Sequence, residues 1–184
     1  MTILSNLGWK HKTDKCPQIK HHFTEFYDEM FRYRRDTVKK VVEIGIGNMH
    51  PYYVKGASLY MWREYFPNAR IYGADIDPNL LFEEDRIKTI LCDQTKSEDL
   101  GNLIKITGDD IDLFIDDGLH TPESQVFTCQ TVMPLISKDT IYVIEDAGHR
   151  HQIMNGLQEF NARILRYSKL KYNDDCMIVV RNKL

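Results

Sequence analysis

The sequence predicts an α/β fold with a doubly wound, mostly parallel sheet of about seven strands and a C-terminal antiparallel hairpin. Three observations predict it. The 184 residues correspond to about one domain, and a hydrophobic content of 42% is enough for a core. Short, β-branched apolar runs alternate with stretches of helical character, as in strand–helix–strand units. The last two apolar runs are separated by a polar turn, which favours a hairpin.

The chain is interpreted as one domain, 1–184, in which a helical lead-in, 1–37, precedes an α/β core, 38–184. In the lead-in, apolar residues recur at spacings of three and four and therefore share one face of a helix. These residues are Ile19, Phe23, Phe26, Tyr27, Met30 and Phe31.

The first strand–helix–strand unit follows the lead-in. Val38–Gly45 is largely β-branched and ends in glycine, which indicates a buried strand that enters a tight turn. Ala57–Tyr65 has the composition of a helix, and Pro67-Asn68 is expected to end it. Arg70–Asp75 is predicted to be the second strand, which ends at an acidic residue.

The middle of the core continues this alternation. Ile87–Leu91 and Ile111–Ile115 are short apolar runs and are predicted to be strands, joined by a polar helix at Ser97–Ile106. Thr121-Pro122 places a capping hydroxyl before a proline at the first helical position, so a helix is expected from there towards Ile136.

The last elements complete the sheet. Thr140–Ile144 is predicted to be a strand, and a helix is expected around Gln152–Asn161. Arg163–Leu170 and Cys176–Arg181 have β-like composition and are joined by Asn173–Asp175, which predicts the closing hairpin.

Composition excludes several classes of function. The chain has a net charge of −3, so we do not expect the basic surface with which proteins bind nucleic acid without sequence preference. No apolar run is long enough to span a bilayer, and the N-terminus lacks the layout of a signal peptide. We therefore expect a soluble, cytoplasmic protein without nucleic-acid or membrane partners. Cys16, Cys92, Cys129 and Cys176 are widely spaced and are expected to be reduced, mostly buried thiols.

Ligands of such sheets bind at the carboxyl ends of the strands, where the strand order reverses. Gly45 and Gly47 follow the first strand and would let the backbone approach a ligand, although glycines here can also serve a turn alone. Asp75 ends the second strand, where a carboxylate can bind both hydroxyls of a ribose. Asp77 is the other candidate for this ribose contact. The alternative for either residue is a solvated loop position without a ligand. Asp93 follows the third strand and could accept from an adenine amino group or cap the next helix.

Acidic residues also follow the fourth and fifth strands, which are neighbours in a doubly wound sheet. Asp117, Glu145 and Asp146 can therefore converge, with His120 nearby. Crowded carboxylates raise one another's pKa unless a cation lies between them, and oxygen ligands favour Mg²⁺, Mn²⁺ or Ca²⁺. The alternative is that Asp116 and Asp117 cap the next helix, that Glu145 and Asp146 form an acidic loop, and that His120 is a cap or a packing residue.

Together, these residues resemble a class I S-adenosylmethionine-dependent methyltransferase, a Rossmann-like fold, and in particular the metal-dependent sugar O-methyltransferases of macrolide biosynthesis. The resemblance spans about Thr13 to Asp146. Its matching segments are Thr13-Asp14-Lys15, His21–Thr24, Val42–Gly47, Gly56–Arg63, Ile71–Ile76, Asp93-Gln94, Ile115–His120 and Val143–Asp146. The DDGxH and IED segments in this order are the most specific of them.

The resemblance implies a role for each matching residue. Asp117, Glu145 and Asp146 would bind Mg²⁺, with Mn²⁺ or Ca²⁺ as alternatives, and His120 would be the general base, so that His120 and Asp117 are the catalytic pair. S-adenosyl-L-methionine would be the cofactor. Its expected contacts are Glu43, Gly45, Gly47, Ser58, Asp75, Asp93 and Asp116.

The expected reaction is methyl transfer to a hydroxyl of a small-molecule or carbohydrate acceptor, whose identity is left open. A homo-oligomer is an open possibility, because a short chain can need a partner subunit to close an acceptor site. Three alternatives remain: a nicotinamide-dependent oxidoreductase, an enzyme like the cephalosporin hydroxylases, and a non-catalytic cofactor-binding module. The missing third glycine counts against the first, and the retained catalytic residues count against the last.

Overall fold

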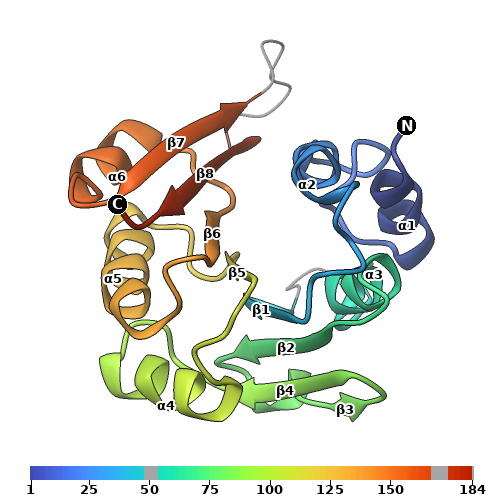
Figure 1. The fold of residues 1–184 in the computed structure, drawn as a ribbon, viewed down its shortest axis with the longest axis horizontal. Coiled ribbons are helices and arrows are strands. Elements are labelled where there is room, and N and C mark those ends of the chain that lie inside the picture. The colour runs from blue at the N-terminus through green and yellow to red at the C-terminus, as the bar shows by residue number, and fades with distance from the viewer. Residues whose placement is uncertain (48–53, 167–173, 184) are drawn as a thin grey trace.

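The computed structural model describes residues 1–47, 54–166 and 174–183. The described strands form one eight-stranded sheet in the order β3-β4-β2-β1-β5-β6-β8-β7 (Figure 1). The strands are β1 (Lys40–Ile44), β2 (Arg70–Asp75), β3 (Glu83–Glu84), β4 (Ile87–Leu91), β5 (Leu113–Asp116), β6 (Ile141–Ile144), β7 (Asn161–Arg166) and β8 (Cys176–Arg181). The five strands from β4 to β6 in this order are parallel, whereas β3, β8 and β7 join antiparallel.

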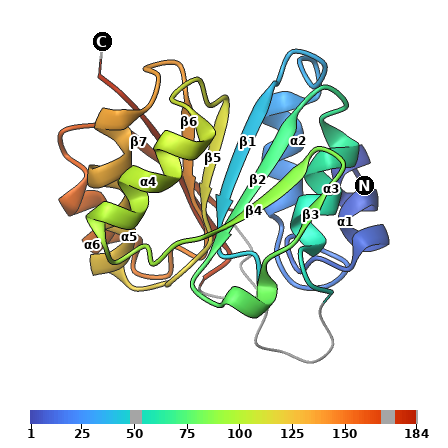
Figure 2. The ribbon, with the colours of Figure 1, turned by 90° about the horizontal axis from the view of Figure 1, so that it is seen from below.

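Helices cover both faces of the sheet (Figures 1 and 2). One face carries α1 (Ile3–His11), α2 (Phe23–Phe31) and α3 (Ala57–Tyr65), and the other carries α4 (Ser97–Thr107), α5 (Pro122–Val132) and α6 (Arg150–Gly156). Each face has its own hydrophobic core. Trp62 and Tyr27 lie in the first core, and Phe114 and Tyr142 lie in the second, all without exposed surface.

The topology places the strand-order reversal between β1 and β5. The chain moves from β1 outward through β2 to β4 and then returns to β5 on the other side of β1. Ile44 pairs with Asp116 in this register, so the residues that follow both strands emerge side by side. This is the position at which a doubly wound sheet binds its ligands.

The predicted fold class is confirmed, and several elements match to the residue. The bounds of α3, β2, β4 and β8 are those expected from the sequence. The predicted cap is also present, because the Thr121 side chain accepts a hydrogen bond from the Ser124 amide. All four cysteines are free and buried, as expected.

Other elements differ from the prediction. Helix α1 was not singled out as a separate helix, and the two-residue strand β3 was missed, so the sheet has eight strands rather than about seven. Helix α6 occupies 150–156 rather than the predicted 152–161, and Ile19 lies outside α2. The far half of the predicted strand at 163–170 and the start of the predicted turn lie outside the described residues. No described helix combines the length and the apolar content needed to cross a membrane.

Candidate active site

A sharp turn after β1 forms one wall of the site. Gly45 has a φ of +85°, and a Cβ there would lie 2.0 Å from the carbonyl oxygen of Asp117. A side chain at this position would therefore meet main chain that cannot rotate away. Glycine at this position is required both by the backbone angle and by the close contact between the turn and the residues after β5.

Asp75, at the end of β2, holds this turn. Its Oδ2 accepts hydrogen bonds from the amides of Ile46 at 3.0 Å and Gly47 at 3.1 Å, and its Oδ1 accepts one from the amide of Asp77 at 3.0 Å. The competitor, Asp77, caps the short 3-10 helix that begins at Pro78. The half-buried carboxylate of Asp75 therefore organises the glycine turn through three main-chain hydrogen bonds.

Glu43, on β1, lies beneath the turn and is fully buried. Its two carboxylate oxygens accept hydrogen bonds from the Ser58 hydroxyl at 2.7 Å and from the Trp62 indole at 2.5 Å. Glu43 and Ser58, which are both predicted to contact the cofactor, thus bind each other. Ser58 lines the cavity described below, whereas Glu43 does not.

Among the other predicted cofactor contacts, Gly45, Asp75, Asp93 and Asp116 do not line that cavity. Asp93 accepts hydrogen bonds from the amide and hydroxyl of Thr95, within its own turn. Asp116 is fully buried and accepts hydrogen bonds from Gln94 at 3.0 Å and from the Tyr142 hydroxyl at 3.3 Å. Burial raises the pKa of Asp116 to about 7 despite its contact with Gln94.

Asp117, His120 and Asp146 converge in the space next to the glycine turn. His120 Nε2 lies 3.2 Å from Asp117 Oδ1 and 3.5 Å from Asp146 Oδ2. Although burial lowers the pKa of His120, its hydrogen bond to Asp117 and the negative charges around it raise the pKa to about 9. Burial and the charge of Asp117 raise the pKa of Asp146 to about 7.

These three residues fit a divalent cation. One side-chain ligand atom from each lies within 4.8 Å of the others. In addition, Asp146 Oδ1 is buried, and its described contact is the ring of His21 at 3.2 Å. Carboxylate oxygens are the ligands that Mg²⁺ and Mn²⁺ prefer, and a cation would remove the repulsion that raises the pKa of Asp146.

The third predicted metal ligand, Glu145, faces the protein interior. Its Oε1 accepts a hydrogen bond from the Tyr27 hydroxyl at 2.7 Å, and its Oε2 pairs with the ammonium of Lys15. Burial raises the pKa of Glu145 well above its usual value, and the charge of Lys15 opposes this shift. The structure thus brings Asp117 and Asp146 together with His120, and it places the carboxylate of Glu145 against Lys15.

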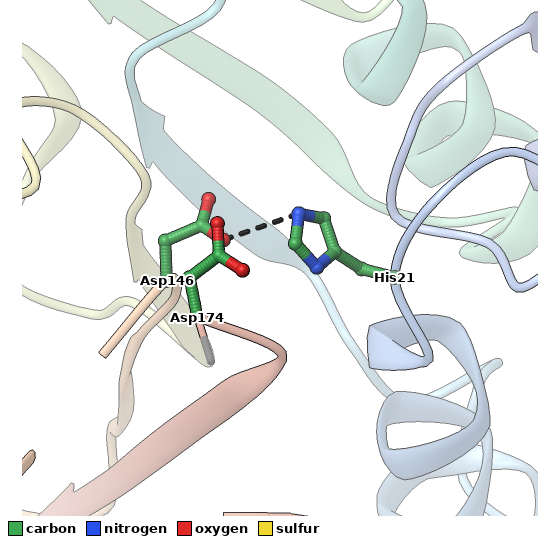
Figure 3. A group of neighbouring side chains, drawn as sticks. All are labelled: His21, Asp146 and Asp174. Atoms are coloured by element: carbon green, nitrogen blue, oxygen red, sulfur yellow. Dashed lines mark ion pairs between the residues drawn. The ribbon is translucent and has the colours of Figure 1, made fainter. Parts of the chain in front are cut away.

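Asp146 also contacts the N-terminal part of the chain (Figure 3). His21 Nε2 lies 3.2 Å from Asp146 Oδ1, and His21 Nδ1 lies 3.6 Å from Asp175 Oδ1. Asp175, which directly precedes β8, is buried and also accepts hydrogen bonds from the amide and ring of His22. Asp174 lies beside Asp146, and one side-chain ligand atom from each of His21, Asp146 and Asp174 lies within 4.8 Å of the others. Asp146 is therefore oriented by both ends of the described chain.

One cavity of about 410 Å³ joins the two halves of the site. The turn and α3 contribute Ile46, Gly47, Ala57 and Ser58, and the other half contributes Asp117, Gly118, His120 and Asp146. Lys12–Lys15 forms another wall. The cavity therefore connects the glycine turn with the acidic residues.

Sequence reasoning did not assign functions to four polar groups of the site. Lys15 and His21 lie in segments that resemble the methyltransferase family, but no role was predicted for them. Tyr27 was predicted to lie on the apolar face of a helix. Trp62 lies in another such segment, again without a predicted role. Their polar atoms bind carboxylates more than 15 residues away in sequence, so no local pattern marks them. The lead-in contains several other lysines and histidines, such as Lys10, His11, Lys12 and Lys20, so residue type alone does not distinguish Lys15 and His21.

Comparisons with curated proteins identify related enzymes. The chain is 37% identical over 145 residues to a Streptomyces olivaceus protein named 8-demethyl-8-(2-methoxy-alpha-L-rhamnosyl)-tetracenomycin-C 3'-O-methyltransferase. It is 38% identical over 144 residues to the mycinamicin VI 2''-O-methyltransferase of Micromonospora griseorubida. These matches cover 78% of the chain but only 36% and 35% of the relatives, so the chain spans about a third of the length of the curated relatives it matches. No model of a protein family matches the chain.

Solved structures agree with this relationship. The MycE methyltransferase of the mycinamycin pathway, in complex with Mg, SAH and mycinamycin VI, superposes with a TM-score of 0.78 and 26% identity. That match covers 98% of this chain and 54% of MycE. An SAH-bound Podospora anserina methyltransferase, at 14% identity and a TM-score of 0.61, shares the fold. The chain therefore has the class I S-adenosylmethionine-dependent methyltransferase fold and is related in sequence to the sugar O-methyltransferases of macrolide and similar antibiotics.

Proposed function

We propose that this chain is an O-methyltransferase that uses S-adenosylmethionine and a divalent cation, preferably Mg²⁺, to methylate a hydroxyl of a sugar-bearing small molecule. The observation that carries the proposal is the cavity that joins the glycine turn to Asp117, His120 and Asp146. The related enzymes are named as O-methyltransferases of sugar units, and MycE was solved with Mg and SAH.

In this proposal, the cofactor lies against the turn after β1. Gly47 lines the cavity, and Gly45 permits the left-handed backbone of the turn. Asp75 holds the turn through main-chain hydrogen bonds, and we place the ribose hydroxyls next to its carboxylate. Ser58 lines the same part of the cavity, and Glu43 supports Ser58 from below. Asp93 and Asp116 remain candidates for more distant parts of the cofactor.

The acceptor lies on the other side, against the acidic residues. Asp117 and Asp146 would hold the cation, with Glu145 as the additional ligand implied by the resemblance. A bound divalent cation would lower the pKa of an acceptor hydroxyl that coordinates it and, through its charge, the pKa of His120. His120 Nε2 would then accept the hydroxyl proton, a contribution of roughly 10²- to 10⁴-fold for a placed base.

The test is direct measurement of cofactor and acceptor use. Isothermal titration calorimetry with S-adenosylhomocysteine, and with NAD as the competing cofactor, separates a methyltransferase from a nicotinamide-dependent enzyme. Transfer of a labelled methyl group to a panel of glycosylated small molecules, with Mg²⁺ or with EDTA, then tests the reaction. Binding of NAD but not of S-adenosylhomocysteine would refute the proposal.

A further inference from the structure

The buried ammonium of Lys15 lies between the two halves of the site. Only 2% of its side chain is exposed. Its Nζ lies 2.5 Å from Asp117 Oδ2 and 3.4 Å from Glu43 Oε1, and it also pairs with Glu145 Oε2. Three strands, β1, β5 and β6, thus direct carboxylates towards one lysine that comes from the segment between α1 and α2.

Lys15 and its three acidic neighbours form one cluster in the protein interior. One ammonium faces three carboxylates, each of them buried or nearly so. The contacts of Lys15 Nζ with Asp117 and Glu145 are those of an ammonium that donates to carboxylates. Removing one partner from such a cluster leaves buried charges without compensation, which is strongly destabilising.

The contact between Lys15 and Asp117 links the lysine to the proposed cation site. Asp117 has two oxygens with different partners: Oδ2 pairs with Lys15, and Oδ1 faces His120 and the proposed cation ligands. A cation held by Asp117 would therefore share this carboxylate with the ammonium. The ammonium would repel such a cation, and Coulomb energies are larger in the protein interior than in water.

We infer that Lys15 is a positioning residue that acts as the internal counter-ion of the site. Its ammonium lets the carboxylates pack together when no cation is bound. The same charge weakens the binding of the cation, so that the cation can exchange. This inference rests on the proposed function, because it assigns Lys15 a role towards the proposed cation. It distinguishes Lys15 from a merely structural ion-pair partner, whose loss would not strengthen cation binding.

The test compares Lys15→Met with the parent and with Lys10→Met. Methionine keeps much of the length of lysine but has no charge. Lys10 pairs with Glu64 on the surface, so its substitution removes an exposed lysine from the neighbouring helix α1. Mn²⁺ binding is measured by electron paramagnetic resonance of the free ion, and thermal unfolding is followed with and without Mg²⁺.

For Lys15→Met, we expect Mn²⁺ binding to be stronger by about tenfold or more, because a nearby positive charge has been removed. We also expect its unfolding temperature to fall without a divalent cation and to recover largely with Mg²⁺, since the cation then supplies the missing charge. Lys10→Met should match the parent in both measurements. A variant that folds only when the cation is present would be the extreme form of the expected result.

The remaining outcomes separate this inference from the proposed function. If the parent binds Mn²⁺ and Lys15→Met binds it equally or more weakly, Lys15 is not a counter-ion of this kind, while the proposed cation site stands. If neither protein binds Mn²⁺, both ideas fail. If only Lys15→Met binds it, the counter-ion role is supported and cation dependence is removed from the proposed function. A Lys15→Met protein that stays unfolded at saturating Mn²⁺ overturns the inference.

Discussion

The glycine turn after β1 provides the sharpest test of the geometry. Replacing Gly45 with alanine forces a side chain into a left-handed conformation, at a cost of about 1–2 kcal/mol. The new Cβ would also lie 2.0 Å from the Asp117 carbonyl oxygen and 2.8 Å from the Gly118 Cα. Because the neighbours are main chain, relief requires a backbone shift of the kind that costs about 1–3 kcal/mol in an overpacked core. We expect Gly45→Ala to lower the free energy of unfolding by about 2–5 kcal/mol.

The assay is urea unfolding at equilibrium, with Gly101→Ala as the matched control. A Cβ at Gly101, within α4, would meet nothing within 4 Å. This substitution should stabilise the protein by about 0.5–1 kcal/mol, because alanine is the better helix former. A loss below about 1 kcal/mol for Gly45→Ala would show that the turn can yield, and the reasoning from close contact would then be wrong.

Four further predictions concern the site. Asp75→Asn removes the charge that strengthens hydrogen bonding at the turn. The affinity for S-adenosylhomocysteine, measured by calorimetry, should therefore fall by roughly 10- to 100-fold. A change within about threefold would mean that the ribose binds elsewhere. His120→Ala should lower methyl transfer by roughly 10²- to 10⁴-fold with little change in that affinity, whereas lost cofactor binding would indicate a structural role. EDTA should abolish methyl transfer and Mg²⁺ should restore it; full activity in the chelator would argue against the cation. Trp62→Phe removes the indole donor to Glu43 and should lower the unfolding temperature, while the same change at the half-exposed Trp9 should have little effect; equal effects would contradict the importance of this hydrogen bond.

Much of the site could be predicted because the ends of strands can be recognised from local sequence patterns. A β-branched run that ends in glycine or aspartate marks both the strand and its carboxyl end, and parallel topology then gathers these ends at one edge. Gly45, Asp117 and Asp146 were found in this way and lie together in the structure. The helix that begins after Thr121 was found equally well, because a capping hydroxyl followed by proline is a local signal.

The remaining features depend on contacts that no local pattern encodes. Lys15 meets Asp117 and Glu145 across 102 and 130 residues of sequence, so its role follows only from the way the lead-in packs on the sheet. Tyr27 satisfies the helical apolar pattern while its hydroxyl binds Glu145. Strand β3 has two glutamates and no apolar residue, and its pairing with β4 alone defines it.

The attachment of the last strand to the lead-in has a consequence for the order of folding. Asp175, which precedes β8, binds His22 across 153 residues, and β8 itself lies between β6 and β7. Contacts between such distant segments form late and slowly, because much of the chain must be ordered before they can close. During synthesis, the earlier strands can therefore pair before the segment around Asp175 reaches His22. We expect the pocket to acquire its ligand-binding geometry only after β8 has paired with β6.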